Sequence, residues 1–247
     1  MKKNIVIISI ILLFGCSNPK PNNLMYEDSS NKFHVIITEY ENDKSIDSLY
    51  SLNELDDPTS TKEVGYIKNG FRNGTWVYNL DTAIRKIEWG HYKDKDLNFE
   101  ISTFVNIDTI KHGDMYSKLQ FITDSGNINL IVSINGSLKD SLPETNYEQF
   151  LRNDVNKVGG QLLDFNILKV RGLFSDVYIC NIALQYGDSK KRYFKSVFSY
   201  IDKDHFVDVA VSSGRQNDFY ANELFDAVLT DFRLNGKKLI IFFFSKA

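Results

Sequence analysis

The sequence predicts an α+β fold, in which an antiparallel sheet carries two main helices. Most of the chain after residue 96 consists of short apolar stretches separated by turn residues, which is typical of antiparallel strands. Two segments, 145–158 and 218–234, instead repeat their apolar residues at helical spacing. These helices separate runs of several strands rather than alternating with single strands, and that order favours α+β over α/β.

The chain begins with a short apolar segment behind a charged start. Lys2 and Lys3 precede an apolar run over residues 5–14, which only Ser9 interrupts. A helix needs roughly 20 apolar residues to span a bilayer, so this run is too short to be a membrane anchor. The pattern is typical of a secretory signal peptide over residues 1–15.

The end of this signal carries a recognisable motif. The residues Leu13-Phe14-Gly15-Cys16 resemble the lipobox of bacterial lipoproteins. The resemblance implies cleavage before Cys16, a diacylglyceryl thioether on its sulfur and an acylated (palmitate-type) N-terminus. Two or three acyl chains make a stable membrane anchor, whereas one chain holds a protein only marginally. The alternative is an ordinary cleaved signal in which Cys16 is a bystander.

Charge and cysteine content narrow the classes of function. Two of the 29 basic residues lie in the predicted signal, so the mature chain has 27 against 32 acidic residues, a net charge of −5. Nucleic-acid binding calls for a basic stripe, so a nucleic-acid partner is not expected. With Cys16 acylated, Cys180 has no partner for an intrachain disulfide and is interpreted as a small buried residue. Ser17 follows Cys16, where an aspartate would indicate inner-membrane retention, and this favours the outer membrane.

The first part of the mature chain divides into a tether and a small β segment. Residues 16–32 are polar, include two prolines and are predicted to form a flexible tether. Residues 33–95 are predicted to form the β segment. It begins with a strand over 32–40, and the polar stretch 42–62 is interpreted as loop.

A glycine-bracketed hairpin is predicted over residues 65–78. Asn69-Gly70 favours a tight turn with positive φ, and Trp76 and Tyr78 are two residues apart, so they share one face of the sheet. The segment resembles one MORN-like repeat, and a degenerate echo beginning at Gly90 extends the resemblance over residues 65–95. Arrays of such repeats need about three units, so we expect this segment to pack against the rest of the protein. Trp76 and Tyr78 have two interpretations, as core residues or as a contact patch for a partner.

The remaining residues, 96–247, are predicted to form the α+β domain. Strands are predicted over 97–110, 116–121, 127–134, 162–170, 176–186, 192–201, 206–212 and 238–244. A capping box at Thr145 and Glu148 opens the first helix, and Asn235-Gly236 is interpreted as the end of the second. The order of elements resembles the PsbP-like fold, whose members typically act as accessory or binding modules rather than catalysts.

The sequence predicts no catalytic site, no cofactor and no metal site. Its four histidines are too far apart to form a helical zinc pair. A hydrolase could pair His205 with Ser212 or Ser213, but the nucleophile-elbow motif is missing. The short acidic clusters 94–96, 124–127 and 202–204 fit hairpin turns, and a calcium loop needs more oxygen ligands than any of them supplies.

The predicted function is therefore that of a membrane-anchored envelope lipoprotein acting as a binding or accessory module. It would contact membrane lipid through Cys16 and a protein partner in the cell envelope. One alternative is an envelope hydrolase or metal-dependent enzyme, which converging catalytic side chains would favour. Another is an immunity-type lipoprotein that binds a toxin, which an acidic face would favour.

Overall fold

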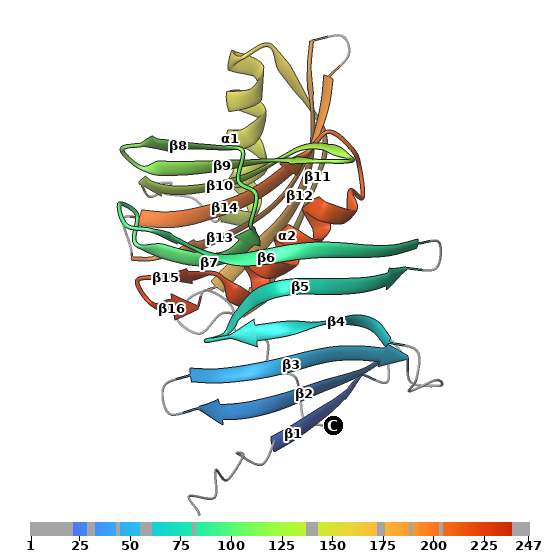
Figure 1. Ribbon diagram of the computed structural model, residues 1–247. Coiled ribbons are helices and arrows are strands. Elements are labelled where there is room, and N and C mark those ends of the chain that lie inside the picture. Colours follow the sequence, from blue (N-terminus) through green and yellow to red (C-terminus); the bar gives the residue numbers. More distant parts are fainter. Residues whose placement is uncertain are drawn as a thin grey trace, which may run out of the picture.

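Two antiparallel β-sheets make up most of the protein (Figure 1). The computed structural model describes residues 22–28, 33–42, 45–54, 61–80, 83–136, 143–171, 176–187, 190–202 and 205–238. Only two helices occur among these residues. The prediction of an α+β fold, a PsbP-like sheet with two main helices, is therefore wrong, because the protein is mostly β. Alternating sequences predict strands but not their neighbours, and the strands after residue 96 are divided between two sheets.

The first sheet has nine strands in the order β1-β2-β3-β4-β5-β6-β7-β15-β16. Its long strands are β1 (Asn22–Asp28), β2 (Phe33–Asn42), β3 (Ser45–Glu54), β4 (Thr61–Lys68), β5 (Phe71–Leu80), β6 (Ala83–Asp94) and β7 (Phe99–Phe104). Part of the predicted tether forms β1, and β3 lies where a loop was expected. Two short strands, β15 (Arg233–Leu234) and β16 (Lys237–Lys238), complete the sheet beside β7, so it includes strands from both sides of residue 95.

The second sheet has seven strands in the order β11-β12-β13-β14-β10-β9-β8. The four-strand meander that the sequence predicts is confirmed as β11 (Gly160–Arg171), β12 (Asp176–Tyr186), β13 (Lys190–Tyr200) and β14 (His205–Ser213). The other strands are β8 (Thr109–Gly113), β9 (Tyr116–Thr123) and β10 (Gly126–Gly136). The stretch 97–110, expected as one strand, is divided between β7 and the start of β8.

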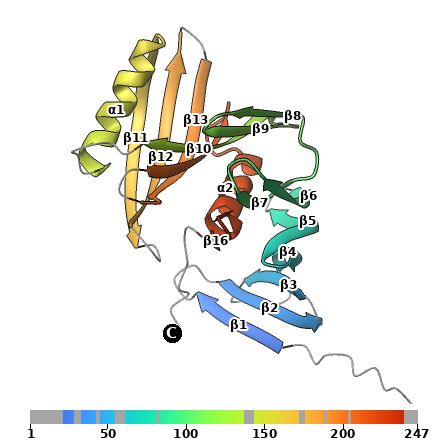
Figure 2. The ribbon, with the colours of Figure 1, turned by 90° about the vertical axis from the view of Figure 1, so that its left-hand side faces the viewer.

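The two helices lie on opposite faces of the second sheet (Figure 2). Helix α1 (Pro143–Lys157) packs through Tyr147 and Val155 on the face that carries Cys180 and Phe198. Helix α2 (Phe219–Asp231) packs on the other face and also contacts the first sheet. Because side chains alternate between the faces of a strand, β12, β13 and β14 supply one set of residues to each helix.

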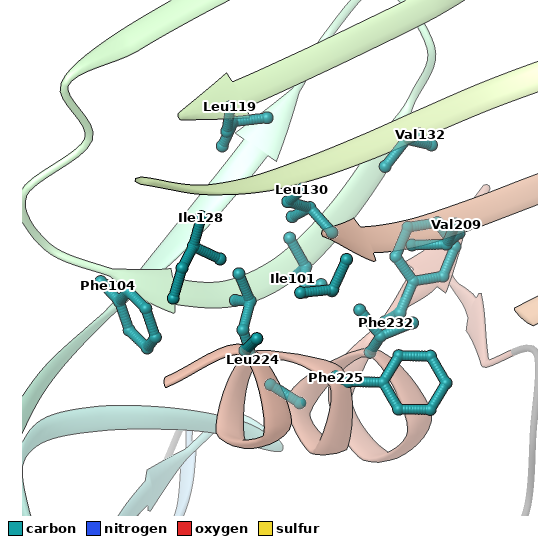
Figure 3. Close-up of a cluster of buried hydrophobic side chains, with 14 of the residues drawn as sticks. Ile101, Phe104, Leu119, Ile128, Leu130, Val132, Val209, Leu224, Phe225 and Phe232 are labelled. Atoms are coloured by element: carbon teal, nitrogen blue, oxygen red, sulfur yellow. The ribbon is translucent and has the colours of Figure 1, made fainter. Parts of the chain in front are cut away.

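The larger core surrounds α2 (Figure 3). Leu224 is completely buried and points from α2 toward Ile101 of the first sheet and the strands of the second sheet that carry Ile128 and Leu130. Burying one such side chain contributes about 1.5–3 kcal/mol. The α2 helix begins as predicted, because the Asp218 carboxylate accepts a hydrogen bond from the Ala221 amide at 3.1 Å. Its end differs from the prediction. Asn235-Gly236 has positive φ but forms the turn between β15 and β16, beyond the helix.

Neither of the described helices combines the length and the apolar character that crossing a membrane requires. The predicted signal peptide, Cys16 and residues 239–244 of the predicted closing strand lie outside the described residues.

Candidate functional site

The β4–β5 hairpin forms as the sequence predicts. Lys68 pairs with Phe71, and Asn69 and Gly70 between them have φ values of 54° and 80°, as a tight Asn-Gly turn requires. The indole of Trp76 lies directly over Gly65, where a Cβ atom would be only 2.1 Å from the ring. The glycine and the tryptophan of the MORN-like segment therefore form one packing unit.

Trp76 and Tyr78 are both part of the core. Their exposed fractions are 1% and 3%, which favours the core interpretation over a direct contact with a partner. Trp89 donates a hydrogen bond from Nε1 to the Tyr78 hydroxyl at 3.2 Å. The guanidinium of Arg72 lies 5.0 Å from the ring centre of Trp76 and 5.1 Å from that of Trp89. These distances allow cation–π attraction to both rings.

Acidic side chains gather around this arginine from β4 and α2. Arg72 forms ion pairs with Glu223 at 3.4 Å and with Asp231 at 3.9 Å. Glu63 and Asp226 also lie close enough to interact with its charge. We call this group the Arg72 cluster, and its members are Glu63, Arg72, Tyr78, Glu223, Asp226 and Asp231.

Asp231 holds the inner side of the cluster together. Its Oδ2 atom accepts hydrogen bonds from the Ser102 hydroxyl at 2.5 Å and from the Arg72 amide at 3.2 Å, while Oδ1 accepts from Thr230 at 2.7 Å. One carboxylate at the end of α2 therefore connects that helix to β5 and β7. Asp226, five residues earlier in α2, is exposed at the outer side.

The environment shifts the pKa of two glutamates upward. Burial raises the pKa of Glu63 to about 6, against the attraction of Arg72, which lowers it. Burial, together with the nearby charge of Glu63, raises the pKa of Glu223 to about 8. Both glutamates therefore bind a proton more readily than an exposed glutamate does, and the contact between Arg72 and Glu223 is an ion pair only while Glu223 is ionised. The Arg72 cluster has the chemistry for ion pairing and for proton exchange near neutral pH.

The structure separates the residues that a hydrolase would need. His205 is exposed at the start of β14 and lies 3.1 Å from Asp202, whereas Ser212 and Ser213 are buried at the far end of the same strand. At about 3.3 Å per residue, the histidine and either serine are more than about 20 Å apart. Cys180 is a free, buried cysteine, as expected, and burial raises the pKa of its thiol to about 12.

One group of side chains could in principle hold a metal ion. Asp94, Asp96 and His112 each place a ligand atom within 4.8 Å of the others. However, Asp94 Oδ1 accepts hydrogen bonds from the amides of Asp96 at 3.0 Å and Leu97 at 2.9 Å, which confirms the turn role expected for the 94–96 cluster. The turn accounts for Oδ1 of the buried Asp94, while its Oδ2 lies 3.4 Å from Nδ1 of His112.

No family model matches the chain, and a comparison with curated proteins gives no match. The site is therefore assigned from its geometry alone. The sequence pattern indicates Trp76 and Tyr78 but not the charged residues around them. Arg72 and its partner Glu223 are 151 residues apart in the chain. One feature of the sequence could have identified the cluster. Each element carries a charged residue on its apolar face, Arg72 in the hairpin and Glu223 in the helix.

Proposed function

We propose that the protein is a lipid-anchored component of the cell envelope, placed by its signal at the outer membrane, and that its folded part binds a protein partner. The lipobox-like residues around Cys16 support the anchor. The acidic outer side of the Arg72 cluster supports binding, because it suits a basic side chain of the partner. An immunity-type lipoprotein is the special case in which that partner is a basic toxin.

The binding proposal depends on the excess of carboxyl groups over guanidinium groups in the Arg72 cluster. Four carboxyl groups share one guanidinium. Lys195 approaches Asp226 and Lys238 approaches Asp231, yet with both lysines in place the pKa values of Glu63 and Glu223 remain raised. A cationic group arriving beside Glu63 and the exposed Asp226 would stabilise their ionised forms.

The anchor is tested by replacing Cys16 with alanine. We expect the wild-type protein to partition with membranes and to have the intact mass of an acylated chain that begins at Cys16. The Cys16→Ala protein should move to the soluble fraction, because it has lost the sulfur that carries the diacylglyceryl group. Cys180→Ala is the matched control and should stay in the membrane. An unacylated wild-type protein would contradict the anchor.

The acidic site is tested with a trilysine amide peptide as the cationic probe, using calorimetry on the full-length protein in non-ionic detergent. The Glu63→Gln/Asp226→Asn variant should bind the probe about tenfold more weakly, since each lost charge pair contributes about 0.5–1 kcal/mol. Binding to the wild type should also strengthen from pH 5.5 to pH 8.5, as the carboxyl groups lose their protons.

The control for this experiment changes the net charge by the same amount elsewhere. Asp114 and Asp164 are exposed and lie outside the Arg72 cluster. Asp114→Asn/Asp164→Asn should leave the affinity within about twofold of the wild type, a small change on the scale of surface charges. Equal weakening by both double variants would show attraction to the overall charge, and the proposed site would be wrong.

A further inference from the structure

A second polar group lies under α1, on the opposite face of the second sheet from α2. Asp208 of β14, Ser196 of β13 and Cys180 of β12 share this face with Tyr147, which α1 places above them. The surrounding side chains are aromatic, with Tyr147 4.6 Å from Phe198 between ring centres. We call these four residues, Tyr147, Cys180, Ser196 and Asp208, the Asp208 cluster.

The Asp208 cluster is incompletely satisfied. Asp208 Oδ1 and Ser196 Oγ are both buried, and neither has a hydrogen-bond partner of ordinary geometry among the described residues. The other carboxylate oxygen, Oδ2, accepts a long hydrogen bond of 3.4 Å from the Tyr147 hydroxyl. An ionised carboxylate in this position would be poorly compensated, whereas a protonated one is neutral and can itself donate a hydrogen bond.

Tyr147 is a main contact between α1 and the sheet. Among the α1 side chains that the structure describes, Tyr147 and Val155 are buried and Leu151 is partly buried against the same cluster. Gln149, Arg152 and Asn153 face the solvent. Because Tyr147 lies above Asp208, the state of that carboxyl group acts directly on one of the buried contacts that attach α1.

We propose that α1 is a pH-dependent cap on this face of the sheet, held closed while Asp208 is protonated and released when Asp208 ionises. Opening lets water reach the carboxylate and removes the cost of burying its charge. It also uncovers the aromatic face that includes Tyr178, Phe198 and Phe206. This inference does not depend on the Arg72 cluster or on the membrane anchor.

The direction of the effect follows from proton linkage. Burial raises the pKa of Asp208 from 3.8 to about 7, while the hydrogen bond from Tyr147 lowers it. The closed state therefore binds the proton more tightly than an open state in which Asp208 is hydrated. The cap is most stable below pH 3.8, loses stability as the pH rises towards 7, and is uniformly weaker above that.

The groups that face Asp208 do not reverse this direction. Among the described side chains, the facing titratable group is Tyr147 from α1 and Cys180 from β12, and burial raises the pKa of both well above neutrality. From β13 the facing group is Ser196, and β10 places Ser133 opposite Asp208 in the ladder. Neither serine changes charge, so Asp208 is the group of this cluster that titrates between pH 5 and 8.

Hydrogen–deuterium exchange of the full-length protein in non-ionic detergent tests the proposal. After correction for intrinsic exchange, the opening constant of α1 amides should rise from pH 5.5 to pH 8.5 by up to about 30-fold in the wild type. Asp208→Asn keeps the shape of the side chain but cannot ionise. In this variant the opening constant of the α1 amides should therefore change by less than about twofold over the same pH range. A wild-type helix without pH dependence, or an equal rise in Asp208→Asn, would overturn the proposal.

Two controls separate the cap from other effects. Asp176→Asn removes an exposed carboxylate of the same sheet and should keep the wild-type rise. Peptides from β9 and β10 should exchange without the rise, because the opening is local to α1.

A second measurement needs no variant. Alkylation of the buried Cys180, normalised to a free thiol at each pH, should accelerate by the same factor, and an unchanged rate would count against the cap.

Discussion

Replacing Arg72 with methionine is expected to lower the free energy of unfolding by about 3–5 kcal/mol at pH 8.5. Methionine fills a similar space between Trp76 and Trp89 but leaves Asp231 and Glu223 without their buried cation. The cation–π attraction to both rings is also lost. Urea denaturation followed by tryptophan fluorescence measures the change at this site, because the only two tryptophans of the chain flank Arg72.

The same variant should lose less stability at pH 5.5. The pKa values of Glu63 and Glu223 are already raised to about 6 and about 8, so at pH 5.5 most of these carboxyl groups are neutral and need no cation. Arg152→Gln is the matched control, because Arg152 is exposed and pairs with Glu148 on α1. It should cost only about 0.3–0.5 kcal/mol. If Arg72→Met costs no more than Arg152→Gln, the central role given to Arg72 is wrong.

Replacing Gly65 with alanine should cost about 2–3 kcal/mol, although the added group is a single methyl. That methyl would lie 2.1 Å from the Trp76 indole, which is fully buried and contacts Arg72 on the same side of the sheet. The ring has to leave its position, and with it the hydrogen bond from Trp76 Nε1 to the carbonyl oxygen of Tyr66. Urea denaturation measures the loss, and the fluorescence spectrum should shift as the indole moves.

The glycine that opens the degenerate echo, Gly90, provides a matched control for this substitution. Gly90 occupies the equivalent place in the degenerate echo, but the nearest atom to a Cβ there is a Val105 methyl at 3.4 Å. Gly90→Ala should therefore stay within about 0.5 kcal/mol of the wild type. Similar costs at the two glycines would contradict the packing role that we assign to Gly65.

Local pattern was enough to predict elements whose stability depends on local features. The strand expected over 176–186 is β12, and the Asn69-Gly70 turn forms as its residues require. The loop expected over 42–62 instead contains β3, a strand that pairs with β2 on one side and β4 on the other. Pairing of this kind depends on which strands lie next to each other, and the alternation of apolar and polar residues in one strand does not identify its neighbours.

The same limit applies to the candidate site. The Arg72 cluster joins β4 and β5 to a helix about 150 residues later, and each charged residue looks like an ordinary surface residue in its own segment. The division of the strands into two sheets was missed for a related reason. Asn235-Gly236 is compatible with either a helix end or a hairpin turn. It forms the hairpin turn because β15, which precedes it, pairs with β7. Long-range packing decided each of these cases.

The position of α2 between the sheets constrains when the protein can fold. Trp76 and Phe99 are made early, but Phe232, which stacks on Phe99, and Leu224 of the same core come near the end of the chain. If the chain is exported unfolded, as the predicted signal peptide implies, it has no complete core until nearly all of it has crossed the membrane. Contacts of such long sequence separation make folding slow. Late completion of the core would keep an exported chain in a state that can still be translocated.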